Sequence, residues 1–218
     1  MQRPLFITGI GTDVGKTLIS AIITEALGAA YWKPVQAGFE QGTDAGWVKQ
    51  MLSNPLSVVH QELYILNTPA SPHIAARIDG VTIEADSIKD KAICLMQSLP
   101  GKPFVIEGAG GLLVPLQDHL MVADLIKKIN ARVILVSRNY LGSINHSLLT
   151  AAYCRSNNID VAGWIFNDDY MQYEEEIVRW SGYPSLGSVP KLEKIDASTI
   201  REQAARLQKN LSEKLLTV

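Results

Sequence analysis

Residues 5–17 read LFITGIGTDVGKT, and this stretch decides the fold. An apolar run at residues 5–8 leads into a glycine-rich turn, and Gly15, Lys16 and Thr17 then open a segment with helical periodicity. Glycines in such a turn let backbone N–H groups wrap around phosphate oxygens, and the start of the following helix adds positive potential. A strand, a glycine-rich loop and a helix in this order predict the phosphate-binding loop of a P-loop nucleotide-binding protein.

Two side chains of this loop match the chemistry of nucleotide binding. Lys16 can reach the β- and γ-phosphate oxygens, and the Thr17 hydroxyl can bind Mg²⁺. Ile10 stands where the standard spacing has glycine, with Gly9 one place earlier, so the loop is a variant. A tight strand-to-helix turn is the alternative, but it needs neither the lysine nor the threonine. We therefore expect the loop to bind nucleotide through Asp13, Val14, Gly15, Lys16, Thr17 and Leu18.

The rest of the chain alternates short apolar runs with segments of helical periodicity. The expected buried strands are residues 5–8, 30–33, 104–106, 133–136 and 161–166. The expected helices are residues 18–27, 86–99, 123–129, 147–155 and 197–215. This alternation predicts an α/β fold in which a parallel sheet carries helices on both faces. Residues 36–66 and 183–195 are typical of long loops with short elements, and we expect residues 1–218 to form a single domain.

Composition and charge exclude several classes of protein. Of the 218 residues, 47% are hydrophobic and 19% are charged, which is typical of a folded protein rather than a disordered one. The formal charge is −2, and no block of like charges is long enough to follow a nucleic-acid backbone. No apolar run reaches the length of a membrane span, and Cys94 and Cys154 match neither a disulfide framework nor a zinc site. We expect a cytosolic protein with no nucleic-acid or membrane partner.

A carboxylate follows the expected strand at residues 104–106. P-loop proteins place an acidic residue at the end of a neighbouring strand to hold the metal, and Glu107 has this position. The alternative is a strand-end carboxylate paired with a surface lysine. Gly108, Gly110 and Gly111 follow directly and suggest a close approach of another group to this backbone.

Lys33 and Asp44 have less certain roles from the residues alone. Lys33 ends an expected strand, and Pro34 after it imposes an extended backbone. Its side chain either emerges at the carboxyl edge of the sheet, where such folds bind ligands, or is an ordinary solvated lysine. Asp44 stands beside Thr43 at the start of a helical segment, and either residue could simply cap that helix.

Two further segments lie at expected strand ends. Asn167 and Asp168 follow residues 161–166, where an amide can donate to and accept from a purine edge, or can close an Asx turn. Residues 140–146 precede the helix expected at 147–155, and their backbone amides form either an anion site or an ordinary capping loop.

Taken in order, the motifs TGIGTDVGKT, YWKPVQAG, SPH, VIEGAGGLLVPL, LGSINHSLLTA and GWIFND closely resemble the dethiobiotin synthetases of biotin biosynthesis. The resemblance covers residues 4–192. The phosphate loop and EGAGG are also similar to the amide-forming synthetases of cobalamin synthesis, whereas KPV, SPH and LGSINH are narrower signatures. The wider glycine spacing of the dethiobiotin synthetases also accounts for Ile10.

This resemblance implies an ATP- and Mg²⁺-dependent ligase that makes dethiobiotin from 7,8-diaminononanoate and CO₂, with release of ADP and phosphate. One amine would capture CO₂ as a carbamate, ATP would phosphorylate it, and the second amine would close the cyclic urea. Lys16 and Lys33 would be catalytic, with Lys33 on the carbamate and the γ-phosphate. The Mg²⁺ ligands would be Thr17, Asp44 and Glu107.

The resemblance also implies binding residues and an assembly. Asn167 and Asp168 would read the adenine, and the other nucleotide contacts would be Gly108, Ala109, Gly110, Pro190, Lys191 and Leu192. The substrate contacts would be Thr12, Lys33, Ala37, Gly142 and Asn145. Residues 142–145 would come from the neighbouring subunit of a homodimer with shared active sites. Ala37 replaces the usual Ser or Thr hydroxyl, and Lys191 replaces an apolar residue, so substrate affinity or nucleotide preference could differ.

Two other functions share parts of this pattern. An ATP-dependent amidation synthetase would need a nucleophilic cysteine to hydrolyse glutamine, and neither Cys94 nor Cys154 stands in a recognisable Cys-His setting. A nucleotide-switched partition ATPase would carry a second loop lysine where Gly11 stands. Both alternatives are therefore weaker than the ligase.

Overall fold

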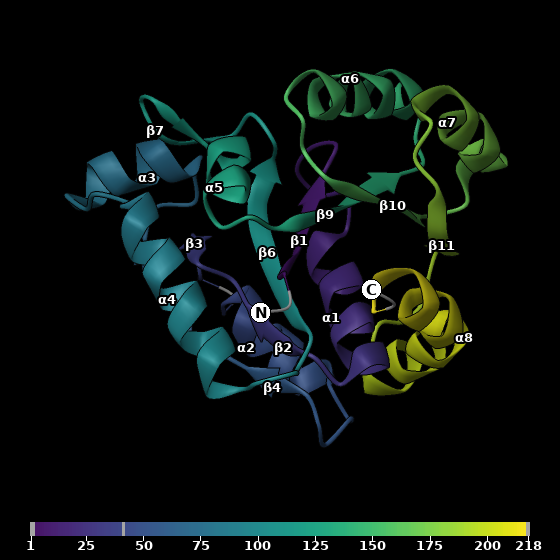
Figure 1. The fold of residues 1–218 in the computed structure, drawn as a ribbon, viewed down its shortest axis with the longest axis horizontal. Helices are drawn as coiled ribbons and strands as arrows, with labels where there is room; N and C mark the ends of the chain where they lie inside the picture. Colours follow the sequence, from purple (N-terminus) through teal and green to yellow (C-terminus); the bar gives the residue numbers. More distant parts are fainter. Residues whose placement is uncertain (1–2, 41, 217–218) are drawn as a thin grey trace.

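A computed structural model describes residues 3–40 and 42–216. Within these ranges seven strands form one sheet in the order β11-β10-β9-β1-β6-β2-β4, and each neighbouring pair is parallel (Figure 1). This confirms the predicted parallel α/β sheet. In the same order the strands are Ser185–Val189, Val161–Asn167, Arg132–Arg138, Leu5–Gly9, Phe104–Gly111, Ala30–Trp32 and Val58–Val59.

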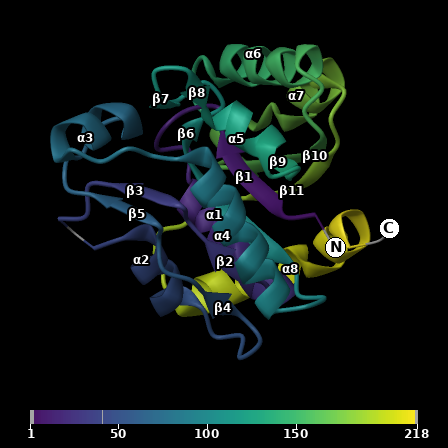
Figure 2. The ribbon, with the colours of Figure 1, turned by 60° about the vertical axis from the view of Figure 1, so that its left-hand side comes forward.

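Helices cover both faces of the sheet, as the alternation predicts (Figures 1 and 2). Adjacent strand residues point to opposite faces, so Phe6 and Ile7 belong to two separate buried clusters. On the Ile7 face lie α1 (Lys16–Leu27), α2 (Asp44–Met51) and α8 (Ala197–Leu215). The Phe6 face is covered by α3 (Pro72–Asp79), α4 (Ala85–Ser98), α5 (Val122–Lys128), α6 (Ser143–Ser156) and α7 (Glu174–Ser181).

Short strands form two small sheets that are separate from the main sheet. Strand β3 (Val35–Ala37) pairs in parallel with β5 (Tyr64–Leu66), and both lie beside α3 at the left of Figure 2. Strands β7 (Pro115–Gln117) and β8 (Leu120–Met121) form an antiparallel hairpin, and a 3₁₀ turn, η1, covers Tyr170–Gln172. None of the described helices combines the length and the apolar character needed to cross a membrane.

Residues 183–195, predicted to be a long loop with short elements, contain a short strand near their start. Residues Ser185–Val189 form the edge strand β11, although their sequence, SLGSV, has few of the residues that favour strands. Tertiary packing explains the strand: Gly187 has φ 138°, and a Cβ there would lie 2.5 Å from Leu207 Cδ2 of α8. The absence of a side chain thus lets α8 lie close to this edge of the sheet.

Helix α6 begins at Ser143, earlier than the predicted start at residue 147. Its buried positions include Ser143, Ser147, Ala151 and Cys154, which recur at helical spacing but are mostly small or polar. The apolar pattern that marks a helix face is therefore weak at its start. Strand β6 also continues to Gly111, so Glu107 lies inside a strand and not after one.

Strand β1 occupies the point at which the chain connections change direction. The chain leaves β1 through α1 and reaches β2 on one side, but it reaches β9 on the other side only after β6 and α5. Ligands of open α/β sheets bind at the carboxyl ends of the strands at such a point. The phosphate loop follows β1 directly, so the topology places it at this crevice.

Candidate active site

The phosphate loop is shaped by a glycine and by a contact from strand β10. Gly15 has φ 92°, in the left-handed region, and Lys16 is the first residue of α1. A Cβ at Gly15 would lie 2.2 Å from Asn167 Nδ2, and this amide nitrogen donates a 3.0 Å hydrogen bond to the Val14 carbonyl. Position 15 therefore requires glycine both for its backbone conformation and for the close approach of Asn167.

Lys16 and Thr17 lie on the side of the loop that faces β6. Lys16 is buried, and its Nζ donates to the Gly11 carbonyl at 3.0 Å. Burial lowers the pKa of Lys16, and the negative charge of Glu107 offsets only part of this effect. The Thr17 hydroxyl donates to Glu107 Oε1 at 2.8 Å. The two loop side chains predicted to touch phosphate and metal therefore lie next to the predicted metal carboxylate.

Glu107 is 1% exposed and accepts three hydrogen bonds. Its Oε1 accepts from Thr17 Oγ1 and, at 3.2 Å, from Lys33 Nζ. Its Oε2 accepts from the Tyr31 hydroxyl at 2.9 Å. Burial first, and then the charge of Glu107, raises the pKa of Tyr31 well above its usual value, so the phenol stays protonated and acts as the donor. The surface-lysine alternative for Glu107 is wrong, because its lysine partner is buried.

Lys33 lies directly after β2 and is 7% exposed, so it is not a solvated surface lysine. Its Nζ forms ion pairs with Asp44 Oδ2 and with Glu107 Oε1. Burial alone would lower the pKa of Lys33, but the two carboxylates outweigh burial and hold this pKa above its ordinary value. The ammonium group therefore stays charged at the carboxyl edge of the sheet.

The capping alternative for Asp44 is resolved by its neighbour. Thr43 is the N-cap of α2, and its hydroxyl accepts from the Gly46 N–H at 3.1 Å, which leaves the Asp44 carboxylate for Lys33. The Asp44 N–H donates to Gln36 Oε1 at 3.2 Å. Gln36 also donates through Nε2 to the Gly38 carbonyl, so it links the segment after β3 to the start of α2.

A cavity of about 1010 Å³ lies in front of these groups, a volume suited to a ligand of nucleotide size. The segment Pro69–Pro72, which contains the SPH motif's serine and proline, forms one wall of it. The predicted site residues that line it are Thr12, Asp13, Gly15, Lys16, Thr17, Lys33, Ala37, Asp44, Glu107, Ala109 and Gly110.

Three predicted nucleotide contacts, Val14, Leu18 and Gly108, do not line this cavity. Val14 is buried, Leu18 packs against the Ile7-face cluster, and Gly108 lies against β1, where a Cβ would come within 2.6 Å of Phe6 Cε1. The glycine at 108 is therefore explained by the packing of neighbouring strands.

The residues predicted to hold adenine gather at the ends of β10 and β11. Asn167 pairs with Val189 in the sheet, and the Asp168 N–H donates to the Val189 carbonyl at 3.0 Å. Asp168 accepts from the Asp169 N–H at 2.9 Å and from Arg138 Nε at 3.3 Å, and neither is the bond of an Asx turn, in which the side chain accepts from the N–H two residues on. The remaining predicted residues follow β11: Pro190 and Leu192 are half-buried and Lys191 is exposed.

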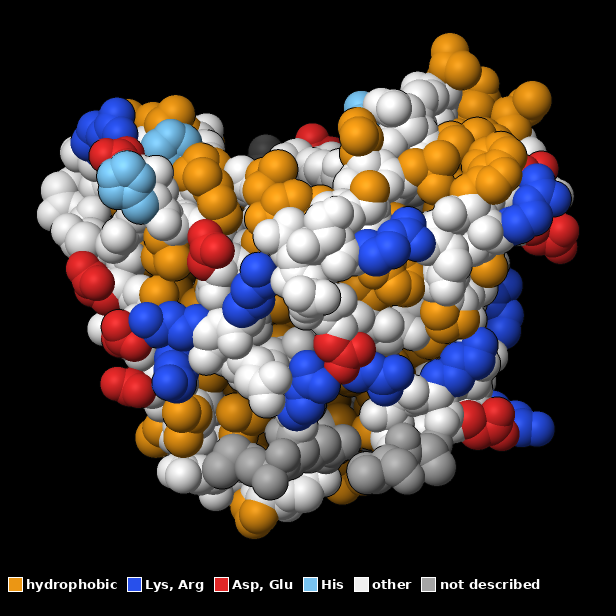
Figure 3. Space-filling model, turned by 45° about the horizontal axis from the view of Figure 1, so that its top comes forward, with side chains coloured by type: hydrophobic (Ala, Val, Ile, Leu, Met, Phe, Trp, Pro, Cys, Tyr) orange, Lys and Arg blue, Asp and Glu red, His pale blue; other side chains and the backbone are white. Residues whose placement is uncertain are grey.

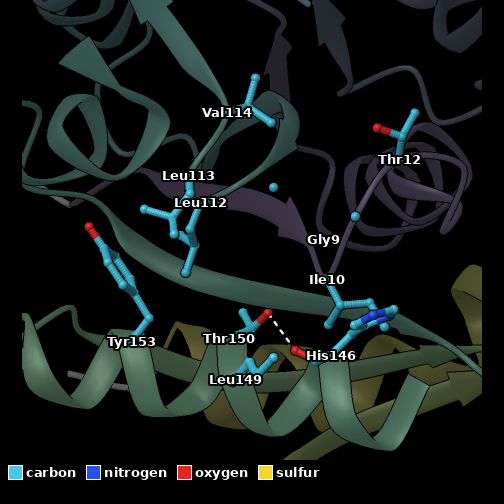
Figure 4. A pocket seen from close by; sticks show the side chains of 12 residues that line it. Gly9, Ile10, Thr12, Leu112, Leu113, Val114, His146, Leu149, Thr150 and Tyr153 are labelled. Atoms are coloured by element: carbon cyan, nitrogen blue, oxygen red, sulfur yellow. Dashed lines mark hydrogen bonds between the residues drawn. The ribbon is translucent and has the colours of Figure 1, made fainter. Parts of the chain in front are cut away.

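A second cavity of about 380 Å³ adjoins the first and is mainly apolar. Figure 4 shows Leu149 and Tyr153 of α6 on one side of it and Ile10 on the other. Thr12 and Val114 line both cavities.

The N-terminus of α6 borders only the smaller cavity, which His146 of its first turn lines. Gly142, with φ 104°, is the N-cap, and the Ser143 N–H donates to the Tyr140 carbonyl. Neither Gly142 nor Asn145 lines either cavity. Within one chain, the two predicted substrate contacts on this helix are thus separated from Lys33.

Sequence reasoning missed Tyr31 and Gln36. No sequence pattern marks Tyr31, because its place beside Val105 and near Glu107 depends on the parallel pairing of residues 30–32 with residues 104–106. The bond from Gln36 to the start of α2 spans a segment of irregular backbone, and no periodic pattern marks it.

Comparisons with known proteins show which family the chain belongs to. A family model described as an AAA domain matches residues 3–199. The ATP-dependent dethiobiotin synthetase of Cytophaga hutchinsonii is 46% identical over 96% of this chain and 98% of its own length. The protein of the same name from Christiangramia forsetii is 44% identical over 98% of this chain and 100% of its own. The chain belongs to the dethiobiotin synthetase family.

Solved structures that resemble this member of the dethiobiotin synthetase family show the wider fold. A ParA family ATPase from Chlorobium tepidum has a TM-score of 0.56 at 15% identity, over 98% of this chain and 93% of that one. The septum site-determining protein MinD from Pyrococcus horikoshii, complexed with Mg-ADP, has a TM-score of 0.57 at 14% identity, over 98% and 99%. At this identity the likeness concerns the P-loop fold alone.

Replacing Lys33 with methionine should destabilise the protein by about 3 kcal/mol, because it leaves two carboxylates near the core without their cation. The pKa of Lys33 is raised on folding, so its contribution is fully present below the ordinary value of 10.5 and is lost only as the pH rises through the higher folded value. Urea unfolding of wild type and Lys33→Met at several pH values measures this gap. A gap that closes well below pH 10.5 would contradict the assignment.

Proposed function

We propose that this chain is an ATP-dependent dethiobiotin synthetase that closes the ureido ring of dethiobiotin from 7,8-diaminononanoate and CO₂. The family membership supports the reaction, and the buried Lys33 ammonium beside the phosphate loop is the observation that carries the mechanism. The substrates are small molecules, in keeping with the absence of a nucleic-acid-binding charge pattern.

The reaction has three steps. One amine of the substrate adds to CO₂ and loses a proton, which gives a carbamate. A carbamate oxygen attacks the γ-phosphorus of ATP, ADP leaves, and a carbamic–phosphoric anhydride forms. The second amine attacks the carbonyl carbon of this anhydride, phosphate leaves, and the cyclic urea is closed.

The carbamate, the γ-phosphate and the leaving phosphate in these steps are all anionic, so fixed positive charges around them are the main requirement. Lys33 would contact the carbamate and the γ-phosphate, and Lys16 would contact the phosphates of ATP. Both lysines line the large cavity, and Thr12 lies in the same wall, where it would contact the diamine. Ala37 also lines this cavity, so substrate binding would lack a hydroxyl at that position.

The residues of the site suit Mg²⁺, which would neutralise phosphate charge when bound. Thr17, Asp44 and Glu107 would hold it, and the two carboxylates already bind a cation, the Lys33 ammonium. No group of three His, Cys, Asp or Glu side chains suited to a metal occurs within residues 3–40 and 42–216. Mg²⁺ commonly combines one or two carboxylates with substrate phosphates, so the nucleotide would complete the metal site.

The adenine would lie at the ends of β10 and β11. Asn167 would contact it while its Nδ2 stays bonded to the phosphate loop, and Pro190 and Leu192 would pack against the base. Lys191 is exposed, so an apolar contact from this position is absent. The carboxylate of Asp168 is already engaged by Arg138, which limits its part in reading the base.

The carboxylate tail of the diamine would bind the α6 N-terminus of a second subunit in a homodimer. Gly142 and Asn145 are exposed and line neither cavity of their own chain, so an origin in the partner would bring them to the site. Large apolar side chains near this helix are also exposed, with Leu141 at 87% and Leu149 at 61%. Figure 3 shows hydrophobic side chains gathered at the upper right, the region of α6 and α7.

Turnover is the direct test of the reaction and of Lys33. ADP release should require both bicarbonate and the diamine, a dependence that neither an amidation synthetase nor a partition ATPase would show. Lys33→Met should lower kcat by at least about 100-fold, as for loss of one transition-state donor, and should change ADP affinity little. ATP hydrolysis that ignores the diamine would refute the proposed reaction, and near wild-type turnover of the variant would refute the lysine's role.

The metal role of Glu107 is tested by Glu107→Gln, which keeps the size of the side chain and removes the charge that a hard cation prefers. The Mg²⁺ concentration for half-maximal turnover should rise at least about tenfold. The matched control is Glu25→Gln. Glu25 is also a buried carboxylate, but it does not line the cavity, and it accepts hydrogen bonds from the Ser53 and Asn54 N–H groups. An unchanged Mg²⁺ titration for Glu107→Gln would leave this residue a purely structural group.

Sharing of the active site between subunits is tested with Asn145→Asp, which sets a carboxylate against the substrate carboxylate. This variant should raise the KM for the diamine at least about tenfold and leave the KM for ATP nearly unchanged. Asn145 is preferable to Gly142 for this test, because any side chain at φ 104° is strained.

Mixing Asn145→Asp with Lys16→Ala by joint denaturation and refolding then separates the two arrangements. In a shared-site heterodimer one site collects both defects and the other collects neither, so about a quarter of wild-type activity should return on statistical pairing. If each site were built within one chain, every site would keep a defect. Absence of recovery in confirmed heterodimers would reject the shared site.

A further inference from the structure

Tyr31 is a fully buried side chain to which the proposed reaction gives no role. Its relative exposure is 0%, and its ring packs in the Ile7-face cluster between the sheet and α1. Its hydroxyl donates to Glu107 Oε2 at 2.9 Å. A buried hydroxyl needs a hydrogen-bond partner, but this partner is a residue of the proposed metal site and not a backbone carbonyl.

The parallel register brings the two residues together. Tyr31 on β2 lies opposite Val105 on β6, and Glu107 is two residues further along the same face. Diagonal neighbours of this kind lie within reach of a long aromatic side chain. The reach of a tyrosine therefore suits this pair, and the sheet holds both backbones in place.

The two oxygens of Glu107 have different surroundings. Oε1 accepts from Thr17 and Lys33, the residues that line the large cavity, whereas Oε2 accepts from Tyr31 alone among the described residues. The terminal torsion of a glutamate is broad, so the covalent structure by itself does not decide which way the carboxylate turns. The hydrogen bond from the Tyr31 hydroxyl, which comes from the core side, fixes this torsion of Glu107.

We propose that Tyr31 is a positioning residue of the metal site: its hydroxyl holds Oε2 of Glu107 and so presents Oε1 to Thr17 and to the cavity. This inference rests on the proposed function, because it takes Glu107 as a metal ligand. Mutation of a partner that orients a metal ligand typically lowers metal affinity by about 10- to 100-fold. A phenylalanine would fill the same space but would leave Oε2 buried without a donor.

The test is Tyr31→Phe, which removes one hydroxyl and keeps the ring. Calorimetry measures the affinity for ADP in Mg²⁺ and in EDTA, and the ratio of the two affinities reports metal binding without catalysis. This ratio should fall about tenfold in the variant, and half-maximal turnover should need about tenfold more Mg²⁺, with the KM for the diamine unchanged.

Thr24→Val is the matched control. Thr24 is also fully buried, on α1, and its hydroxyl donates to the Ser20 carbonyl at 2.7 Å. Loss of this hydroxyl should lower the urea midpoint and leave the ratio of ADP affinities unchanged. If the control lowers the ratio as much as Tyr31→Phe does, general loosening of the core explains the effect and the proposal is overturned.

A double-variant cycle with Glu107→Gln shows whether Tyr31 acts through Glu107. In the Glu107→Gln background, adding Tyr31→Phe should change the ratio little, because the group that it positions has lost its charge. Because the cycle needs all four proteins, cooperative urea unfolding of Tyr31→Phe and of the double variant is checked first.

The outcomes separate this inference from the proposed function. If Glu107→Gln lowers the ratio and Tyr31→Phe does not, the metal site stands and the role of Tyr31 is refuted. If the two effects multiply in the double variant, Tyr31 does not act through Glu107. If Glu107→Gln itself leaves the ratio unchanged, the metal role of Glu107 fails, and the positioning role fails with it.

Discussion

The ammonium of Lys33 lies between the carboxylates of Asp44 and Glu107, and the geometry of the cavity depends on this triad. An amine buried this deeply stays charged only because two anions stand against it. The three residues come from the end of β2, the start of α2 and the middle of β6, so one charged group ties together three segments that are distant in sequence. The course of the chain between β2 and α2 is constrained at both ends by this group.

The same arrangement suits the site to highly charged substrates. Lys16 and Lys33 provide positive charge, Asp44 and Glu107 provide negative charge, and the charges are arranged before any ligand arrives. A preorganised site of this kind needs little rearrangement of dipoles when an anionic transition state forms. Its groups stand on a helix start and on strands rather than on a long free loop, which keeps them in register.

The parts of this protein that follow a strong local pattern could be predicted, and the parts fixed by distant contacts could not. The phosphate loop and the central strands have clear apolar or glycine signals, and the structure confirms them. Strand β11 is held by packing against α8, and the start of α6 by buried serines, so neither has the pattern that periodicity detects. From the residues alone, Lys33 could have been a solvated lysine and Asp44 a helix cap, and the fold shows that the two side chains meet. The role of Tyr31 could not be predicted from the sequence for the same reason, because its hydrogen-bond partner Glu107 lies on another strand.

The hydrogen bond from Asn167 to the Val14 carbonyl joins the two ends of the nucleotide crevice. Residue 15 has no side chain, and Asn167 occupies the space that a side chain would need, so the two positions can change only as a pair. A loop that would otherwise lose conformational freedom on binding is thus already held by a strand end from the other half of the chain. This hydrogen bond links the first and last thirds of the sequence. A fragment of this chain that lacked β10 would therefore lack the contact that supports the phosphate loop at Val14.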